Sequence, residues 1–359
     1  MTDPDSDEPD TSGVDTDGVA LDTDALEGWL ADHAGTSGPL TATQIAGGRS
    51  NLTYRVEDAD GQAFVLRRPP LGDLLPGAHD MSREHRVMAA LADTDVPVPE
   101  MVGISTGPDS VLGADFYVMR FVEGQIVRTA REAESLEPAV RRAAADSLAR
   151  TMATLHALDP QELGLGERAK GENYLARQLH VWRRQLDAQK GRELPVMDDL
   201  HARLTAAIPD QRAVGIVHGD YRLDNVMLAD DGSVAAVLDW ELWTLGDPLA
   251  DVAITMSYWT EAEDAAAEII GRPTTVEGFG NRGDFRRAYH AAGGQEMPDH
   301  LVPYYLSFGV WRLAAIIEGV YQRNLAGAYG EQAESVRMFE EYVPAMARDA
   351  AAYADEAGI

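Results

Sequence analysis

Cysteine is absent from this chain of 359 residues. Its absence excludes disulfide bonds and thiolate chemistry. Long apolar runs are missing as well, and no stretch is long enough to span a lipid bilayer. The first ten residues, MTDPDSDEPD, lack the basic and apolar regions of a signal peptide. We therefore expect a soluble, cytoplasmic protein without a membrane partner.

Lysine is almost as scarce, because Lys170 and Lys190 are the only lysines. Lys and Arg together number 30 against 60 Asp and Glu, which gives a formal net charge of −30. Such a surface repels nucleic acid, so we expect no nucleic-acid partner. It could attract a cationic substrate, but we favour adaptation to high salt, since molar ionic strength shortens the Debye length to ~3 Å and weakens self-repulsion. This halophilic composition therefore says little about the substrate.

The order of residue types along the chain predicts a tail followed by two lobes. Residues 1–24 are rich in Asp, Thr, Ser and Gly, and we expect them to form a disordered acidic tail. A short helix from about Ala25 and several strand patterns follow, whereas the later part of the chain has mainly helical periodicity. We expect an α+β protein with a small antiparallel-sheet lobe over residues 25–122 and a mainly helical lobe over residues 123–359.

The most informative stretch is residues 216–241, IVHGDYRLDNVMLADDGSVAAVLDWE. It holds His218, Asp220 and Asn225 in the pattern H-G-D-x-x-x-x-N, and a following apolar run ends at Asp239 and Glu241. An Asp that accepts a hydroxyl proton, with an Asn and a second Asp as metal ligands, is what phosphoryl transfer from a nucleotide–Mg²⁺ complex requires. Ligands that are all oxygen atoms suit Mg²⁺ rather than zinc. A loop merely capped by Asp and Asn is the structural alternative.

This stretch resembles the catalytic segment of the aminoglycoside phosphotransferase and choline kinase superfamily, which is related to protein kinases. H-G-D-Y-R-L-D-N stands where protein kinases have H-R-D-L-x-x-x-N, and D-W-E stands where they have D-F-G. The resemblance implies a two-lobed protein-kinase-like fold with ATP and Mg²⁺ as cofactors. By position it makes Asp220 the catalytic base and Asn225 and Asp239 the Mg²⁺ ligands, with Glu241 as a further ligand. His218 becomes a structural support of the loop.

An earlier strand–turn–strand is the candidate phosphate-binding element. Its turn contains Gly47, Gly48, Ser50 and Asn51, and such a turn can lay backbone N–H groups against phosphates. Most Gly-Gly turns are only turns, so this signal is weak alone. Its position ahead of the catalytic motif favours a role in binding the nucleotide.

Kinases pair the nucleotide phosphates with a strand lysine and a helix Glu. In FVLRRPP the position of that lysine is occupied by Arg67, and Glu84, in the first turn of a predicted helix, is its expected partner. Arg is not a conservative replacement for Lys in a fitted site. Backbone groups around Arg120 and Val122, in the segment expected to connect the lobes, would meet adenine.

Four stretches carry a more specific resemblance, namely GGRSNLTYRV, VLRRPPLGDLLPGAHDMSRE, FYVMRFVEG and VHGDYRLDNVML…VLDWELWTLGDPLAD. Together they look like the phosphotransferase module that is fused to certain acyl-CoA dehydrogenases. We expect ATP-dependent phosphoryl transfer to a hydroxyl of a small molecule, and the resemblance suggests a hydroxyacyl-CoA. The alternatives are an aminoglycoside- or choline-type kinase, a nucleotide-binding protein without catalysis, and a metal-dependent hydrolase built on His218, Asp220 and Asp239.

Several further residues have two interpretations. The loop that holds His218, Asp220 and Asn225 is called the catalytic loop. Asp251, or failing it Asp247, is the candidate to stabilise this loop, although both could merely cap a helix. Arg312 lies inside an apolar helix, where it either closes a structural ion pair or faces an anionic ligand. An anionic acceptor would need a local cationic pocket, and the candidates for it are Arg177, Arg183, Arg184, Arg312 and Arg323.

Overall fold

The computed structural model describes residues 21–45, 51–70, 80–189, 191–267, 272–326 and 333–359. Two compact units can be distinguished, one formed by residues 1–94 and 98–123 and the other by residues 95–97 and 124–359. The small lobe expected over residues 25–122 therefore lacks residues 95–97. These residues cluster with the helical unit because the backbone N–H of Val237 donates to the Pro97 carbonyl at 2.8 Å.

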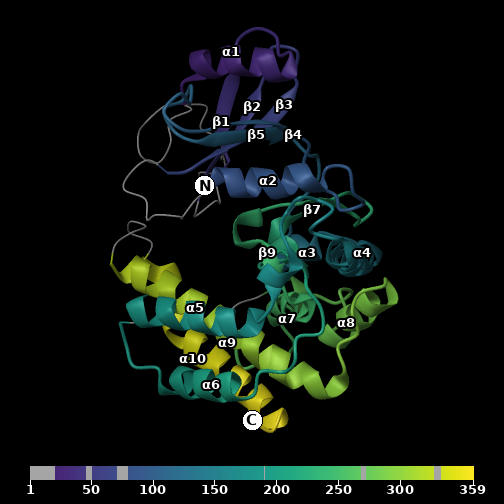
Figure 1. Ribbon diagram of the computed structural model, residues 1–359, viewed down its shortest axis with the longest axis vertical. Helices are drawn as coiled ribbons and strands as arrows, with labels where there is room; N and C mark the ends of the chain where they lie inside the picture. Colours follow the sequence, from purple (N-terminus) through teal and green to yellow (C-terminus); the bar gives the residue numbers. More distant parts are fainter. Residues whose placement is uncertain (1–20, 46–50, 71–79, 190, 268–271, 327–332) are drawn as a thin grey trace, which may run out of the picture. The chain divides into compact units, whose positions relative to one another are not determined.

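The first unit is built on a five-stranded antiparallel sheet in the order β1-β2-β3-β5-β4 (Figure 1). Its elements are α1 (Thr23–Ala34), β1 (Thr41–Gln44), β2 (Leu52–Glu57), β3 (Ala63–Arg68), α2 (Met81–Leu91), β4 (Met101–Ser105) and β5 (Phe116–Arg120). Helix α1 covers one face of the sheet and α2 the other. A hairpin turn at Asp60–Gly61 joins β2 to β3, and Gly61 supplies the positive φ of 81° that this turn needs.

The core of this unit explains where the ordered helix begins. Leu52, Tyr54 and Val56 alternate toward α1 and pack with Leu26 and Leu30. Leu21 is buried in the same cluster, and the Asp22 side chain caps the helix by accepting the Ala25 N–H at 3.0 Å. The helix therefore begins at Thr23, two residues before the predicted Ala25, while residues 1–20 of the predicted tail lie outside the described residues.

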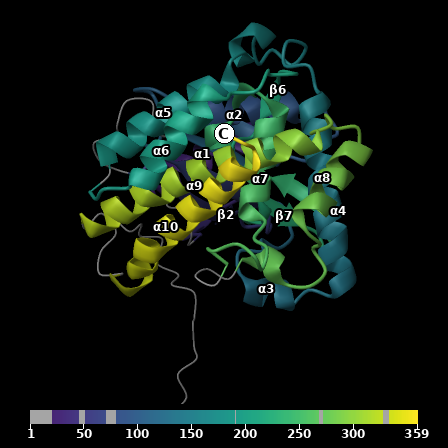
Figure 2. The same ribbon diagram turned by 90° about the horizontal axis from the view of Figure 1, so that it is seen from below.

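The second unit is mainly helical, with two small two-stranded antiparallel sheets, β6–β9 and β7–β8 (Figure 2). Its helices are α3 (Ala130–Glu134), α4 (Pro138–Ala157), α5 (Tyr174–Gln189), α6 (Pro195–Ala206), α7 (Pro248–Tyr258), α8 (Arg282–Ala291), α9 (Val302–Leu325) and α10 (Ala333–Glu356). Its strands are β6 (Gly215–Val217), β7 (Val226–Leu228), β8 (Val234–Val237) and β9 (Thr244–Gly246). Among the described helices, none combines the length and apolarity needed to cross a membrane.

Helix α9 is the centre of this unit, because most of its length is buried and it packs against α5, α7 and α10. A helix that is apolar on all sides is expected in such a position. Gly309 permits the close approach to α7, since a Cβ atom there would lie 2.8 Å from the Ala253 carbonyl oxygen. The packing of α7 against α9 helps to position α7, and with it the α7 side chains that contact the catalytic loop.

Candidate active site

The predicted catalytic residues lie between β6 and β9. Strand β6 ends at Val217, and a 3₁₀ helix, η2 (Leu223–Asn225), leads into β7. Val226 pairs with Val237 across the β7–β8 hairpin, and the Leu238 N–H donates to the Asn225 carbonyl at 2.8 Å. Asn225 and Asp239, distant in the motif, are therefore brought to the same end of one hairpin.

Three donors hold the carboxylate of Asp220. Its Oδ2 accepts a hydrogen bond from the Asn225 side-chain amide at 2.8 Å and lies 3.3 Å from Arg222 Nε. Its Oδ1 accepts the Tyr258 hydroxyl at 2.6 Å. The Asn225 amide also donates to the Asp220 carbonyl at 2.8 Å. These bonds fix the direction of a half-buried carboxylate, which is what a proton acceptor for a bound hydroxyl needs.

Asn225 and Asp239 fit a magnesium ion by the chemistry of their donor atoms. The Asn225 amide nitrogen faces Asp220, so its carbonyl oxygen is turned away from that carboxylate. Within the described residues there is no group of three or more His, Cys, Asp or Glu that could hold a metal on its own. Mg²⁺ commonly uses one or two carboxylates and completes its shell with substrate phosphates and water, so an amide and a carboxylate are sufficient.

The backbone of Asp239 does not have the extended conformation of a strand. It adopts φ 61° and ψ 64°, and the chain then turns into a 3₁₀ helix, η3 (Trp240–Leu242). Glu241 therefore lies in η3 and not on an extended strand with Asp239, and its role as a further metal ligand stays a prediction. A left-handed non-glycine residue costs of the order of 1–3 kcal/mol and is held only where the surroundings require it.

Asp251, in the first turn of α7, supports the catalytic loop through hydrogen bonds to its backbone. Its two carboxylate oxygens accept the backbone N–H groups of His218 and Gly219 at 2.8 and 2.9 Å, and His156 Nε2 lies 3.2 Å away. Burial opposes its ionisation, but the hydrogen bonds from His156 and His218 hold the pKa of Asp251 below its ordinary value. Asp247 instead caps α7 by accepting the Leu249 N–H at 2.9 Å.

His218 and Arg312 also serve the loop. His218 accepts the Asp220 N–H at Nδ1 and contacts the Leu238 carbonyl through Nε2 at 2.9 Å, so both ring nitrogens are engaged. Arg312 is 2% exposed, donates to the Gly219 carbonyl at 2.7 Å and lies over the Trp182 ring. No ion pair of Arg312 is found within the described residues, so of the two alternatives the structural ion pair is replaced by contacts with a backbone carbonyl and an aromatic ring.

In the first unit, the predicted pair of Arg67 and Glu84 is formed. Arg67 Nη1 lies 2.9 Å from a Glu84 carboxylate that is 1% exposed. Asn51 donates its side-chain amide to Glu84 at 3.1 Å, and the Tyr117 hydroxyl donates at 3.0 Å. A carboxylate buried to this degree requires such partners. Of the turn residues predicted to bind phosphate, Asn51 therefore bonds Glu84, the partner of Arg67. Gly47, Gly48 and Ser50 lie outside the described residues.

The two predicted adenine contacts have different surroundings. The Arg120 N–H donates to the Glu100 carbonyl at 2.8 Å, and the Phe121 N–H donates to the Ala63 carbonyl at 3.1 Å. The side chain of Arg120 bonds Gln62 at 3.1 Å. The backbone N–H of Arg120 is therefore engaged within the sheet, and the adenine contact of Arg120 and Val122 stays a prediction.

Tyr258 and Arg222 are site residues that the motif reading missed. Arg222 pairs with Asp220 and, at 2.5 Å, with Asp224, and its guanidinium lies 4.8 Å from the Tyr258 ring centroid. Burial works against the charge of Arg222, but the carboxylates of Asp220 and Asp224 raise its pKa. Burial, aided by the charge of Asp220, raises the pKa of Tyr258, so its hydroxyl remains a donor. Arg222 lies inside the quoted motif, whereas no local signal marks Tyr258.

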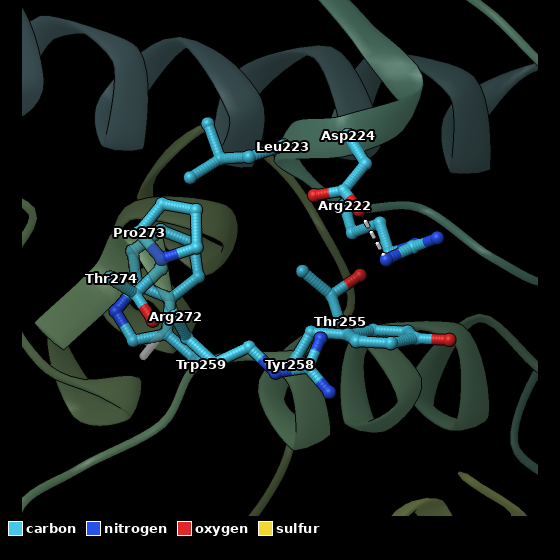
Figure 3. Close-up of a pocket in the computed structure, with 9 residues that line it drawn as sticks. All are labelled: Arg222, Leu223, Asp224, Thr255, Tyr258, Trp259, Arg272, Pro273 and Thr274. Atoms are coloured by element: carbon cyan, nitrogen blue, oxygen red, sulfur yellow. Dashed lines mark hydrogen bonds and ion pairs between the residues drawn. The ribbon is translucent and has the colours of Figure 1, made fainter. Parts of the chain in front are cut away.

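A pocket adjoins this cluster (Figure 3). Arg222 and Tyr258 contact Asp220 and also line the pocket, so its wall lies beside the candidate base. The complete lining is Arg222, Leu223, Asp224, Thr255, Tyr258, Trp259, Arg272, Pro273 and Thr274. Cations, hydroxyls and apolar side chains alternate around it, which suits a polar small molecule better than a purely apolar one.

Four of the five arginines proposed for an anion pocket, all except Arg184, have partners elsewhere. Arg183 pairs with Asp187 and Asp198 at 2.7 and 2.6 Å. Arg177 donates to the carbonyls of Glu172 and Leu245. Arg312 is bound to the loop as described above, Arg323 bonds Gln189 at 3.1 Å, and none of these four lines the pocket beside Asp220. The prediction of an anion site at these positions is not supported by their contacts.

Known proteins resemble both the sequence and the fold. The chain is 37% identical over 316 residues to mouse acyl-CoA dehydrogenase family member 10, covering 85% of this chain and 28% of that protein. It spans 28–40% of the length of the first curated relatives that it matches. The predicted resemblance to the module found in acyl-CoA dehydrogenases is therefore confirmed for a part of those proteins.

Solved structures confirm the kinase-like fold. A protein from Ralstonia eutropha assigned to the aminoglycoside phosphotransferases superposes with a TM-score of 0.77 at 35% identity, covering 93% of this chain and 98% of that one. Choline kinase from Cryptosporidium parvum gives 0.64 at 13% identity, with 93% and 96% covered. A spectinomycin phosphotransferase solved with ADP and spectinomycin gives 0.61 at 12% identity, with 92% and 98% covered.

The model of one family, the phosphotransferase enzyme family, matches residues 41–299, which is most of the chain. The matched range contains Arg67 and Glu84 as well as the whole catalytic segment and the pocket beside it. On this match, and on the fold, the chain belongs to the phosphotransferase enzyme family.

Proposed function

We propose that the protein transfers the γ-phosphoryl group of ATP to a hydroxyl group of a small molecule. The observation that carries this proposal is the carboxylate of Asp220, held by Asn225, Arg222 and Tyr258 at the edge of a pocket. Membership in the phosphotransferase family supports the reaction class. ADP in the solved spectinomycin phosphotransferase of the same fold supports an adenine nucleotide as donor.

The chemistry assigns a separate task to each residue. Asp220 orients the acceptor hydroxyl and takes its proton while the acceptor oxygen bonds to the γ-phosphorus and the bond to the ADP oxygen breaks. Asn225 and Asp239 would hold Mg²⁺, which neutralises phosphate charge when bound. Arg67, oriented by Glu84, would pair with nucleotide phosphates. Rate acceleration then comes from positioning and electrostatics.

The hydrolase alternative is disfavoured by His218. Both of its ring nitrogens are engaged within the loop, and the residue is 0% exposed. It therefore has no free nitrogen for a metal or for a water molecule. A nucleotide-binding protein without catalysis is disfavoured by the elaborate support of Asp220, since binding alone does not require an oriented base.

The acceptor class is a finer proposal. Similarity to part of mouse acyl-CoA dehydrogenase family member 10 favours a hydroxyacyl-CoA as the first class to test. Aminoglycosides and amino alcohols are the second class, on the likeness to the Ralstonia protein and to choline kinase. Either class uses the same hydroxyl chemistry at Asp220.

The test is a transfer assay with γ-labelled ATP in high KCl, with and without Mg²⁺. Acceptors from four classes are compared, namely hydroxyacyl-CoA, sugars, amino alcohols and aminoglycosides. We expect label to appear in one organic acceptor only when Mg²⁺ is present. Label released only as inorganic phosphate in every case would instead support a hydrolase.

A further inference from the structure

Arg272 lines the pocket beside Asp220, and its side-chain hydrogen bond and ring contacts within the described residues are to tyrosines. It precedes a 3₁₀ helix, η4 (Pro273–Thr275), and its Nη2 donates to the Tyr342 hydroxyl at 2.8 Å. Its guanidinium lies 5.3 Å from the Tyr258 ring centroid and 5.9 Å from that of Tyr342. Its Nε is buried without a hydrogen-bond partner. Within the described part of the chain, no carboxylate forms an ion pair with this half-buried cation.

The lack of a carboxylate ion pair for Arg272 within the described residues is unusual for so acidic a chain. The chain has 60 acidic residues against 30 basic ones, so a carboxylate partner is easy to supply. Arg222, on the same pocket wall, has two carboxylate partners, Asp220 and Asp224. A charge removed from water without a charged partner is costly to the fold. This difference in carboxylate partners between Arg222 and Arg272 therefore favours a role of Arg272 in binding a ligand over a role in stabilising the fold.

The other charged group of the pocket is Asp224. Burial raises the pKa of Asp224, while the charges of Arg222 and Arg272 oppose that rise. Since Arg222 binds Asp224 directly at 2.5 Å, this carboxylate already has its counter-ion. The charge of Arg272 is therefore the part of the pocket's charge that is left over for a ligand.

The surrounding residues suit a small molecule with one charged end. Figure 3 shows Pro273, Thr274 and Trp259 on one side of the pocket, across from Asp224 and Arg222, and the Arg272 side chain extends from that side toward Tyr258. Leu223, Pro273 and Trp259 offer apolar contact between the two ends. The hydroxyl of Tyr258 bonds Asp220 while its ring lies near Arg272, so this one residue links the base to the cation.

We propose that Arg272 binds an oxyanion group of the acceptor, a carboxylate or a phosphate, while the acceptor hydroxyl lies at Asp220. This inference rests on the proposed phosphotransferase function and narrows its acceptor to anionic hydroxyl compounds. Arg suits this role because its planar guanidinium donates two parallel hydrogen bonds to an oxyanion.

The test compares acceptors that differ only in charge. Terminal hydroxy acids of increasing chain length, their amides and the corresponding hydroxyalkyl phosphates are assayed with the wild type, Arg272→Gln and Arg272→Lys. We expect Arg272→Gln to raise KM for the acids or phosphates about 10- to 100-fold, as hydrogen bonds to charged groups predict. KM for the amides should change little, and Arg272→Lys should restore part of the preference. If the site binds a carboxylate, the increase in KM should appear for the acids. If it binds a phosphate, the increase should appear for the hydroxyalkyl phosphates.

Arg286→Gln is the matched control, because Arg286 pairs with the exposed Asp299 outside the pocket. It should leave the ratio of KM values for acid and amide unchanged. Thermal unfolding of each variant separates loss of binding from loss of fold. Equal effects of Arg272→Gln on acids and amides, or a wild-type preference for neutral or cationic acceptors, would overturn the anion site while the phosphotransferase proposal stands.

A binding measurement covers the remaining case. If no acceptor is phosphorylated, the proposed function fails, and calorimetry of the same acids and amides still decides the role of Arg272. Tighter binding of the acids that disappears in Arg272→Gln supports the anion site independently of turnover. Equal binding of acids and amides to the wild type counts against it.

Discussion

Asp220 is the residue on which the proposed chemistry depends. In Asp220→Asn the loop should remain folded, because an amide can still accept from Tyr258 and fill the same volume. Proton acceptance is lost, so we expect kcat to fall by about 10²- to 10⁴-fold, the usual range for a general base. Nucleotide binding in the presence of Mg²⁺, measured by calorimetry, should be nearly unchanged. A variant that retains most of its rate would remove Asp220 from the role of base.

Tyr258 is the residue that holds Asp220 from the side of α7. Tyr258→Phe keeps the ring between the guanidinium groups but removes the 2.6 Å hydrogen bond to Oδ1. We expect kcat to fall about 10-fold or more, because hydrogen bonds to charged groups contribute about 1.5–3 kcal/mol. KM for ATP should not change. The measurement is steady-state kinetics for both substrates.

The matched control is Tyr304→Phe. Its hydroxyl donates to the Leu204 carbonyl at 2.9 Å in a buried setting and does not contact the catalytic loop. This variant should lose stability but keep kcat. If both variants lower kcat to the same degree, the effect of Tyr258 is structural and not one of positioning.

At the scale of elements, α7 presents Asp251 to the catalytic loop. Asp251→Asn leaves two buried backbone N–H groups and His156 without their ionised partner, and we expect a loss of about 3 kcal/mol or more in the free energy of unfolding. Chemical denaturation at neutral pH measures this loss. Activity should fall as well, since the same backbone carries Asp220.

The pH dependence of that difference follows from the lowered pKa of Asp251. A carboxyl group whose folded pKa lies below its unfolded value stabilises the fold above the unfolded value, which is 3.8 for Asp. This contribution disappears as pH falls through the folded pKa. The difference in unfolding free energy between wild type and Asp251→Asn should therefore be constant above about pH 5 and shrink below about pH 4. A difference that grows with acidification would contradict the assignment.

At the scale of the whole molecule, the charge of −30 acts on any charged acceptor. Salt screens this long-range field more than a close, partly buried pair such as one formed at Arg272. KM for an anionic acceptor should therefore fall as KCl rises from low to molar concentration, whereas KM for a cationic acceptor should rise. Measuring KM against KCl for a hydroxy acid and an aminoglycoside, with folding monitored separately, checks both trends. A KM that rises with KCl for the hydroxy acid, or falls for the aminoglycoside, would show that the global charge does not control the salt dependence of acceptor binding.

The sequence by itself determined the features whose residues are close in the chain or lie in a recognisable motif. The alternation in Leu52, Tyr54 and Val56 predicted a half-buried strand, because side chains of a strand alternate between its faces. The motif placed Asp220, Asn225 and Asp239 in one segment, and its resemblance to kinase sequences predicted the pairing of Arg67 with Glu84.

Only the tertiary structure decided how that segment is completed. Tyr258 and Arg272 reach the site from α7 and η4, and the positions of these elements depend on packing such as that of Gly309 against Ala253, which no local pattern encodes. The left-handed backbone of Asp239 likewise depends on surroundings that compensate its strain. The reaction class could therefore be predicted from local residue order, whereas the side chains that hold the base and line its pocket are brought there by contacts distant in sequence.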